Sequence, residues 1–207
     1  MTPHQQLEAG ASSLGLALDG KQLVRLTQYL GLIQKWNRVH NLTALRDPQK
    51  MLTYHLLDSL AVLPHVRINR LLDVGSGAGL PGIPLAIARP DWEITLSDSN
   101  HKKSSFQQQA VIELGLSNVR VASGRVEDIK SGQKFDGVIS RAFAGVGEFI
   151  ACTHLLLATA GRWYAMKGVR PDEELAQLPA GVEVERVVPL TVPGLDAQRH
   201  LIILKAV

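Results

Sequence analysis

The chain has 207 residues, of which 45% are hydrophobic and 20% are charged. These proportions are typical of a soluble globular domain and exclude a disordered chain. The single cysteine, Cys152, excludes a disulfide framework and a cysteine-built zinc site, and we expect it in the core. No apolar run approaches the roughly 20 residues that a membrane span needs. The first ten residues also lack the pattern of a secretory signal, so we expect a cytoplasmic protein with no membrane partner.

The net charge of +3 is distributed unevenly along the chain. Residues 1–69 contain seven Lys or Arg and four Asp or Glu, whereas residues 70–207 contain fifteen of each sign. The whole basic excess therefore lies in the first third. We expect part of it to form a basic face beside Arg125, Arg141 and Lys167. The expected members of that face are Lys21, Arg25, Lys35, Arg38, Arg46 and Lys50.

The first third of the chain is predicted to be helical. Asp19, followed three residues later by Gln22, resembles a capping box at the start of a helix. Apolar residues then recur at spacings of three and four, the period of an amphipathic helix. They are Leu23, Leu26, Leu30, Ile33 and Trp36. Asp47 and Pro48 predict a second helix, because aspartate caps helices and proline suits their first position. That helix should end before Pro64.

From Arg70 onward, short apolar strands alternate with helices. The predicted strands are 71–74, 93–96, 119–122, 136–140, 161–166, 182–189 and 200–205, and the predicted helices are 81–88, 101–114, 147–157 and 173–177. This alternation indicates right-handed βαβ units and a mostly parallel sheet. No helix separates the last two strands, so they should pair antiparallel. We therefore predict a doubly wound α/β domain over 70–207, with a seven-stranded sheet and an antiparallel C-terminal strand. Residues 1–69 form a helical N-terminal extension packed against it as one compact unit.

A glycine-rich loop with the sequence DVGSGAGLPG occupies residues 73–82, directly after the first predicted strand. In doubly wound sheets, ligands bind where loops leave the carboxyl ends of the strands. Gly77, Gly79 and Gly82 fit the pattern G-x-G-x-x-G, and Asp98 lies 21 residues after Gly77. This nearly meets the dinucleotide fingerprint, so an NAD-dependent oxidoreductase is one interpretation.

Two residues of the loop argue against a bound dinucleotide. Pro81 offers no backbone donor in the turn that would hold the phosphates. Asp73 places a carboxylate beside the loop, where it would repel a pyrophosphate. A carboxylate at this position suits a ligand with a cationic end, such as the amino group of a methionine moiety.

The loop and acids together resemble S-adenosylmethionine-dependent methyltransferases of the Rossmann-like class, and longer motifs resemble one family more closely. These motifs are Trp36-Asn37, His40-Asn41-Leu42-Thr43, His55-Leu56-Leu57-Asp58-Ser59, residues 73–87, Ser97-Asp98-Ser99 with Lys102-Lys103, Arg125-Val126-Glu127-Asp128, residues 135–144 and Met166-Lys167-Gly168. The chain is similar to the RsmG/GidB family from about residue 20 to its C-terminus. The resemblance implies a 16S ribosomal RNA guanine-N7 methyltransferase that acts in the 530 loop, at guanosine-527 in conventional rRNA numbering. Its partner would be 16S ribosomal RNA or the small ribosomal subunit rather than DNA.

The resemblance assigns a cofactor role to eight residues. Asp73, Gly75 and Gly77 would hold the methionine end of S-adenosylmethionine, and the backbone of Leu80 would close the loop. Asp98 would accept both ribose hydroxyls, although a helix cap before His101 is the alternative. Val126 would cover adenine and Glu127 would meet its polar edge, unless the Glu127-Asp128 pair is simply a solvated turn. Arg141 would contact both the cofactor and the approaching nucleotide.

The predicted substrate contacts lie at strand ends and in loops. Arg141, Phe143 and Lys167 are the predicted catalytic residues, and Phe143 is the expected contact of the target base. Arg125, Lys167 and Arg199 are predicted to bind RNA phosphates, unless they are ordinary solvated charges. Strand-end residues near the order reversal of a doubly wound sheet usually serve function, which favours a role for Arg141.

The remaining polar residues suggest no metal and no catalytic base. His55 and Asp58 lie three residues apart on one helix face, and we expect them to tie the extension to the sheet. Without a second cluster of His, Cys or Asp nearby, we predict no metal site. Guanine N7 carries an in-plane lone pair and no proton, so its methylation needs positioning rather than a general base. A non-enzymatic ribosome-assembly factor is a further alternative. With no obvious exposed apolar helix, we expect a monomer.

Overall fold

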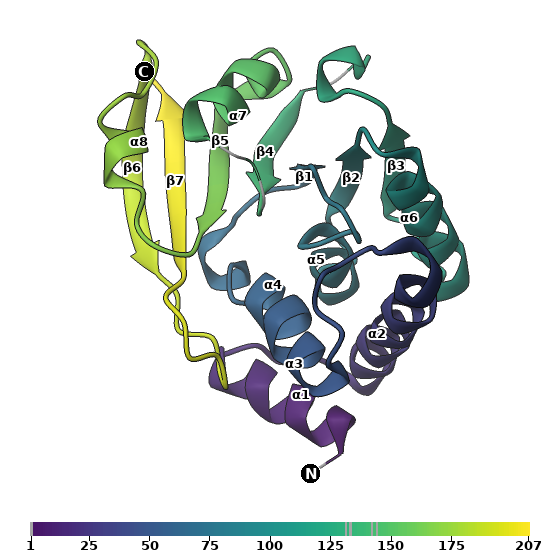
Figure 1. Ribbon diagram of the computed structural model, residues 1–207. Coiled ribbons are helices and arrows are strands. Elements are labelled where there is room, and N and C mark those ends of the chain that lie inside the picture. The colour runs from purple at the N-terminus through teal and green to yellow at the C-terminus, as the bar shows by residue number, and fades with distance from the viewer. Residues whose placement is uncertain (1, 131, 133, 142, 144) are drawn as a thin grey trace.

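A computed structural model describes residues 2–130, 132, 134–141, 143 and 145–207. Ala142 and Ala144, which belong to one of the sequence motifs, lie outside the described residues. Seven strands form a single sheet in the order β3-β2-β1-β4-β5-β7-β6 (Figure 1). They are β1 (Arg70–Val74), β2 (Glu93–Asp98), β3 (Val119–Ser123), β4 (Phe135–Ser140), β5 (Leu157–Lys167), β6 (Val182–Pro189) and β7 (His200–Ala206). The pairs β5·β7 and β6·β7 are antiparallel and the other four pairs are parallel, which confirms the predicted mostly parallel sheet with an antiparallel C-terminal strand.

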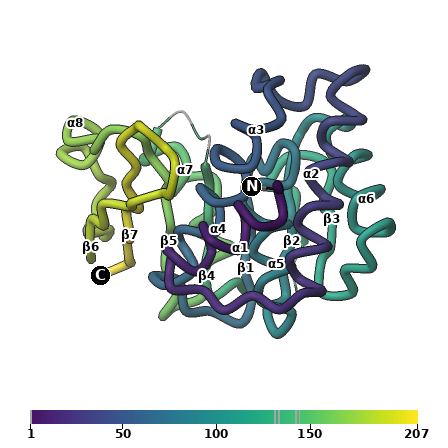
Figure 2. The backbone as a smooth tube through the Cα atoms, turned by 90° about the horizontal axis from the view of Figure 1, so that it is seen from below, coloured from purple at the N-terminus to yellow at the C-terminus, as the bar shows by residue number. Residues whose placement is uncertain are grey.

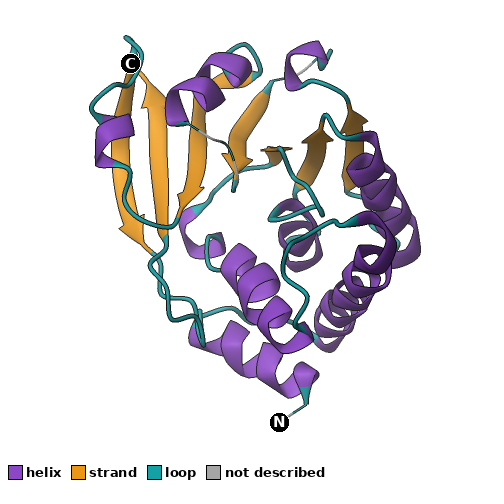
Figure 3. Ribbon diagram, in the orientation of Figure 1, coloured by secondary structure: helices purple, strands orange, loops and turns teal. Residues whose placement is uncertain are grey.

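Helices pack on both faces of this sheet (Figure 3). The helices are α1 (Pro3–Ser13), α2 (Gly20–His40), α3 (Pro48–Met51), the π-helix η1 (Leu52–Leu57), α4 (Asp58–Leu60), α5 (Gly82–Ala88), α6 (His101–Leu114), α7 (Val146–Thr153) and α8 (Asp172–Leu175), with short 3₁₀ turns η2 (Leu63–His65) and η3 (Val126–Asp128). Figure 2 shows α2 and α6 side by side at one end of the sheet, with β6 and β7 at the other. Among the described residues, no helix has the length and apolar character needed to cross a membrane.

Two buried clusters, one on each face, hold the layers together. Successive residues of a strand point to opposite faces. Leu71 accordingly joins the cluster beneath the N-terminal helices, whereas Leu72 joins the cluster beneath α7. Ile139 and Val138 of β4 divide in the same way. Because both faces are covered, the central strands are apolar throughout, as is typical of parallel sheets.

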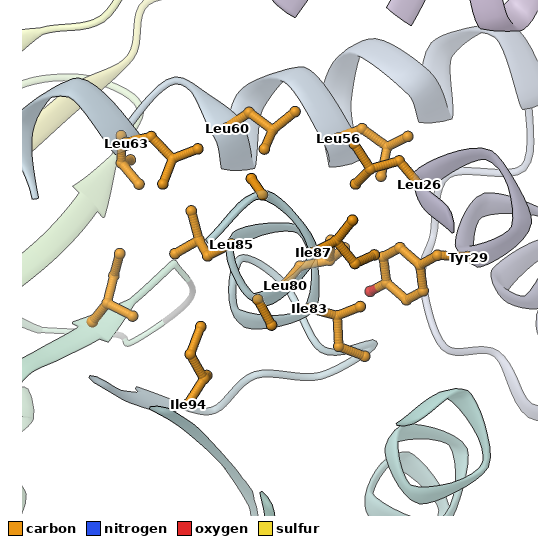
Figure 4. Packing of buried hydrophobic residues seen from close by; sticks show 14 of the residues in the cluster. Leu26, Tyr29, Leu56, Leu60, Leu63, Leu80, Ile83, Leu85, Ile87 and Ile94 are labelled. Carbon is orange, nitrogen blue, oxygen red and sulfur yellow. The ribbon is translucent and has the colours of Figure 1, made fainter. Parts of the chain in front are cut away.

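The N-terminal extension shares the larger core with the sheet. Figure 4 shows Leu26 and Tyr29 of α2 and Leu56 of η1 pointing toward Ile83 and Leu80 around α5. Each of these five side chains is at most 3% exposed and belongs to one cluster. Burying this apolar surface fixes the extension beside the glycine-rich loop.

The sequence prediction missed α1. Its N-cap Thr2 accepts a hydrogen bond from the backbone of Gln5, and the Gln5 side chain accepts one from the Thr2 backbone. Pro3 occupies the first helical position. This capping box followed by an N1 proline is visible in the sequence and could have predicted the helix.

Two predicted boundaries were wrong. The helix predicted over 147–157 ends at Thr153, and β5 already begins at Leu157, which pairs with Phe135. Leu157 is apolar and could belong to a helix or to a strand. Its burial in the cluster beneath α7 places it at the start of β5. The helix predicted to run from Pro48 toward Pro64 is interrupted by π-helical geometry over η1. Apolar spacing does not distinguish a π turn from an α turn over so short a stretch.

Candidate functional site

The glycine-rich loop joins β1 to α5 in a conformation that needs its glycines. The φ angles are +65° at Gly75, +58° at Gly77 and +85° at Gly79. Side chains disfavour this left-handed region, so the loop conformation selects glycine at these positions. Gly82 is required for a different reason, since a Cβ there would lie 2.7 Å from Asp73 Oδ2.

Five of the loop amides, those of Ser76, Gly77, Gly79, Leu80 and Gly82, donate inside the protein rather than to an open anion site. Gly77 donates its N–H to Asp98 Oδ2 at 2.8 Å, and Gly82 donates to Asp73 Oδ2 at 2.7 Å. The amides of Gly79 and Leu80 donate to the Ser76 carbonyl. A phosphate-binding loop needs amides free to receive the anion. This loop therefore does not fit a pyrophosphate, which argues against the dinucleotide interpretation.

Asp73 lies at the carboxyl end of β1 with its side chain fully buried. Its Oδ1 atom accepts no hydrogen bond from the described residues. Burial raises the pKa of Asp73 from its usual value to about 7, although the Gly82 amide and the Arg141 charge oppose the shift. Buried polar atoms normally have partners, so the orphaned oxygen fits a ligand that brings a cation, such as a protonated amino group.

Asp98 ends β2 and connects the loop to the next helix. Its Oδ1 accepts the Asn100 amide at 2.8 Å, while Oδ2 holds Gly77. The cap of α6 is instead Asn100, whose side chain accepts the amides of Lys102 and Lys103. The alternative role of Asp98 as that helix cap is therefore wrong. Each carboxylate oxygen has a further lone pair, so two hydroxyl donors can still be accepted.

Val126 and Glu127 follow β3 in the short turn η3. Val126 is buried in the second cluster, and Glu127 is exposed. The pKa of Glu127 is lowered by hydrogen bonds from its own backbone and from Cys152, and by the charge of Arg125. Cys152 is half-buried on α7, and burial raises the pKa of its thiol. The thiol therefore stays protonated. An apolar side chain beside an acidic one suits a purine, because the first can cover a face of the ring and the second can accept hydrogen bonds from its polar edge.

Two buried polar side chains support the loop from neighbouring helices. The Tyr29 hydroxyl on α2 donates to the Ala78 carbonyl. Burial raises the pKa of Tyr29, so the hydroxyl keeps its proton. Gln107 on α6 donates to Ser76 Oγ at 2.9 Å and to the Gly77 carbonyl at 2.8 Å. Neither contact was predicted. The spacing of residues along a helix indicates which side chains are buried, but it does not indicate which groups their polar atoms contact.

A cavity of about 450 Å³ lies between the helical extension and the carboxyl ends of β4 and β5. Its lining residues are Thr43, Ala44, Leu45, Tyr54, His55, Asp58, Arg141, Met166, Lys167, Gly168 and Arg199. Larger hollows of about 560 and 670 Å³ lie elsewhere, and neither is lined by a predicted cofactor residue. Arg141 connects the 450 Å³ cavity to the loop electrostatically, because it lines the cavity and its charge lowers the pKa of both Asp73 and His55.

Asp58 joins two predicted arginines in this cavity. Arg199 Nε donates to Asp58 Oδ1 at 2.8 Å, and Arg141 Nη1 lies 3.5 Å from Oδ2. The same Arg141 nitrogen donates to the Tyr54 carbonyl at 3.1 Å. Asp58 therefore ties the extension to the sheet, as predicted, whereas the same prediction was wrong for His55, whose ring nitrogens bond to no residue of the sheet that the structure describes. Both arginine side chains remain about one-quarter exposed, so the pair still faces the cavity.

Lys167 and Phe143 are less available than predicted. Lys167 Nζ lies 3.0 Å from both carboxylate oxygens of Glu174 on α8, so its charge is already paired. The Phe143 ring packs against Phe149, with ring centroids 5.6 Å apart, and it does not line the cavity. The aromatic side chain that does line the cavity is Tyr54, which the sequence did not single out.

At least one member of the predicted basic face, Lys21, lies away from the glycine-rich loop. The six members of that face in the extension are all exposed. Lys21, however, precedes Gln22, whose side chain donates to the carbonyls of Ile87 and Ala88 at the end of α5. The start of α2 is therefore at the opposite end of α5 from the glycine-rich loop. Arg125 is exposed beside η3, and its RNA role stays a prediction.

No group of three potential metal ligands occurs within the part of the chain that the structure describes.

A family model described as "GidB: rRNA small subunit methyltransferase G" matches residues 22–202. The chain belongs to the GidB family. Its members are S-adenosylmethionine-dependent methyltransferases of small-subunit ribosomal RNA.

Curated relatives agree over almost the whole length of the chain. The ribosomal RNA small subunit methyltransferase G of Laribacter hongkongensis is 56% identical, with 98% of both chains covered. The protein of the same name from Nitrosospira multiformis is 55% identical over 99% of this chain and 98% of that one. That from Neisseria meningitidis serogroup B is 54% identical over 99% of both.

Solved structures show the same fold at low sequence identity. The glycopeptide N-methyltransferase MtfA in complex with S-adenosyl-L-homocysteine has a TM-score of 0.63 and is 10% identical over 74% of this chain and 87% of that one. Its complex with S-adenosyl-L-methionine has a TM-score of 0.62. A SAM-dependent methyltransferase from Aquifex aeolicus has a TM-score of 0.58 and is 20% identical over 79% of this chain and 96% of that one. The GidB chain thus has the Rossmann-like fold of S-adenosylmethionine-dependent methyltransferases.

Proposed function

We propose that this GidB protein transfers a methyl group from S-adenosylmethionine to N7 of a guanine in the 530 loop of 16S ribosomal RNA, at guanosine-527. The family supports methylation of small-subunit RNA. The observation that carries the choice of N7 is the state of Asp58, the one carboxylate among the described residues that line the cavity. Arg141 and Arg199 already engage it, so it is not free to remove a proton, and the other candidate base of the cavity, His55, is weak because its pKa is lowered to about 4. N7 is a nucleophile that has no proton to lose.

The chain's own residues hold the two ends of the cofactor. Asp73 receives the amino group at its orphaned Oδ1, and the carboxylate of Asp98 accepts the ribose hydroxyls. Val126 and Glu127 lie after β3, where an apolar side chain covers adenine and an acidic one meets its polar edge. When bound, S-adenosylmethionine supplies a methyl group on a sulfonium, which a nucleophile displaces directly. The protein therefore contributes mainly by positioning.

The RNA contacts are expected around the cavity. A base in folded RNA must leave its stack before it reaches a buried methyl donor. Arg141 and Arg199 are half-buried at the cavity, where they can meet the approaching nucleotide. Arg125 and Lys167 are the further proposed contacts. Lys167 must release Glu174 before it can bind an RNA phosphate. We propose a monomer that acts on ribosomal RNA or on the small subunit.

Incubation with methyl-labelled S-adenosylmethionine tests the proposal. Naked 16S ribosomal RNA and unmethylated small subunits are separate substrates, and Asp73→Asn is the inactive control. Label should appear on RNA with at least one of them, and cleavage at 7-methylguanosine should map it to the 530 loop. Label on protein, on DNA or on another RNA atom contradicts the proposal.

Binding measurements separate this function from its alternatives. Tight binding of S-adenosylhomocysteine without binding of NADH excludes the oxidoreductase. A non-enzymatic assembly factor predicts that Asp98→Ala leaves biological function untouched, whereas the proposed reaction requires that substitution to abolish methylation of the RNA.

A further inference from the structure

His55 lies deep in the cavity wall without a partner. It is 5% exposed, and neither ring nitrogen makes a hydrogen bond of good geometry with the described residues. Burial and the nearby Arg141 charge lower its pKa to about 4, although the Tyr54 backbone lies close enough to oppose this shift slightly, so the ring is neutral at pH 7. A neutral imidazole carries one donor and one acceptor. Burying a donor and an acceptor without hydrogen-bond partners costs free energy. This cost indicates that a ligand supplies the missing partners.

The backbone at His55 departs from ordinary helix geometry. Tyr54 and His55 both belong to the π-helix η1. Single π turns inside α-helices occur frequently at functional sites. Here the turn leaves the Tyr54 carbonyl accessible to Arg141, which donates to it. The half-buried Tyr54 side chain lines the same cavity.

The wall carries one positive charge in excess, because Arg141 and Arg199 share a single carboxylate, and this excess suits the phosphate of a nucleotide whose base is neutral. Asp58 pairs with Arg141 and Arg199, and Lys167 pairs with Glu174. Among the described residues that line the cavity, the fully buried side-chain polar atoms without partners are those of the uncharged His55 ring. The volume of about 450 Å³ falls within the usual range of about 300–1,000 Å³ for small-molecule sites. An aromatic ring beside a neutral donor and acceptor suits a nucleobase, which is bound by stacking and by its edge.

We propose that this cavity is the pocket of the target base, with Tyr54 as its stacking surface and His55 as the hydrogen-bond partner of its edge. The proposal rests on the proposed function, because it takes the base to be the methylated guanine. A neutral imidazole also adds no repulsion when positive charge develops on the methylated base. Tyr54 and His55 thus take the role that the sequence analysis gave to Phe143.

Five variants of the full-length protein test the pocket. His55→Phe keeps a ring of similar size without polar atoms, and His55→Gln restores a donor and an acceptor. Tyr54→Leu removes the stacking surface, and Tyr54→Phe retains it. His154→Phe is the control, since His154 is exposed and lines the separate hollow of about 670 Å³ rather than this cavity. Each is compared for melting temperature, S-adenosylhomocysteine affinity and methylation of unmethylated small subunits.

The expected result separates base binding from folding and from cofactor binding. His55→Phe and Tyr54→Leu should each lower the methylation rate at saturating subunits by roughly tenfold or more. His55→Gln and Tyr54→Phe should remain within about threefold of the wild-type protein, by the same reasoning. All five variants should bind S-adenosylhomocysteine within about twofold of the wild-type value, because none alters the glycine-rich loop.

Three outcomes would overturn the pocket. One is wild-type methylation by both His55→Phe and Tyr54→Leu. Another is a loss that falls equally on S-adenosylhomocysteine affinity, and the third is a loss that His55→Gln and Tyr54→Phe share. If His55→Phe does not fold, the Tyr54 pair decides the stacking role alone. Failure of the proposed function is seen separately, as absence of guanine methylation by the unaltered protein.

Discussion

The glycine-rich loop and the cavity beside it are built in different ways. The loop is a contiguous segment whose amides bond to acids at the ends of β1 and β2, nine and 21 residues away. The cavity joins segments far apart in the chain, since Asp58 and Arg199 are separated by 141 residues. In the loop a carboxylate oxygen lacks a partner, and in the cavity an imidazole does. One site is thus prepared for a cationic group and the other for a neutral one.

Asp73→Asn is expected to have the largest effect, and it acts on the loop alone. The amide keeps an oxygen for the Gly82 N–H but cannot pair with the cofactor's amino group. S-adenosylhomocysteine affinity should fall at least about a hundredfold, the scale of a lost buried charge pair. Calorimetric titration measures it. Retention of affinity within threefold contradicts the assigned role of Asp73.

The same substitution should make the folded protein more stable above pH 7. The raised pKa of Asp73, about 7, means that the folded state holds this proton more tightly than the unfolded chain. Stability from this group is therefore present at low pH and is lost as the pH rises toward 7. Asparagine removes that loss, so a gain of about 1 kcal/mol or more is expected at pH 8, with little gain at pH 4. Thermal unfolding at the two pH values provides the comparison.

Gly82→Ala tests how closely the loop is packed on Asp73. The added Cβ would lie 2.3 Å from Leu96 Cδ2, within the buried core. Such overpacking costs about 1–3 kcal/mol. Gly31→Ala is the matched control, because nothing lies within 4 Å of its Cβ and it is exposed in the middle of α2. That control should stabilise the protein by about 0.5–1 kcal/mol. Equal unfolding free energies for the two variants would argue against close packing at Gly82.

Asp58→Asn alters the cavity and leaves the glycine-rich loop unchanged. It removes the charge that holds Arg141 and Arg199, whose side chains are only partly buried. A loss of about 1–2 kcal/mol in unfolding free energy is expected, below the cost of breaking a fully buried pair. S-adenosylhomocysteine affinity should change little, while methylation of RNA falls. If the affinity falls as far as in Asp73→Asn, the two sites are not separable.

The affinity for S-adenosylhomocysteine should also depend on pH. With a pKa of about 7, roughly a tenth of Asp73 is ionised at pH 6, and nearly all of it at pH 8. Because only the carboxylate pairs with the amino group, affinity should rise about tenfold or less between these values. Titrations of the wild-type protein and of Asp73→Asn measure it, and the variant should show no such rise. A flat wild-type profile would falsify the raised pKa.

Sequence reasoning succeeded where the signal is local. The order of strands and helices, the loop and the acids after β1 and β2 follow from short motifs and alternation. It failed where tertiary contacts decide the outcome. Tyr54 and Phe143 are both aromatic residues near polar ones, and only packing places Tyr54 at the cavity and Phe143 against Phe149. The orphaned nitrogens of His55 and the pairing of Lys167 with Glu174 likewise depend on elements that meet only in the fold.

Identification of the methylated atom tests the account most directly. Small subunits that lack the modification are incubated with the protein and S-adenosylmethionine, and their RNA is digested to nucleosides for mass spectrometry. The account predicts 7-methylguanosine as the one new nucleoside, at a single position in the 530 loop, and none with Asp73→Asn. A methyl group on an exocyclic amine, on a pyrimidine carbon or on a ribose would contradict it. Those reactions require a strong proton acceptor or an activated nucleophile, whereas Asp58 is paired with Arg141 and Arg199 and the low pKa of His55 makes it a weak base.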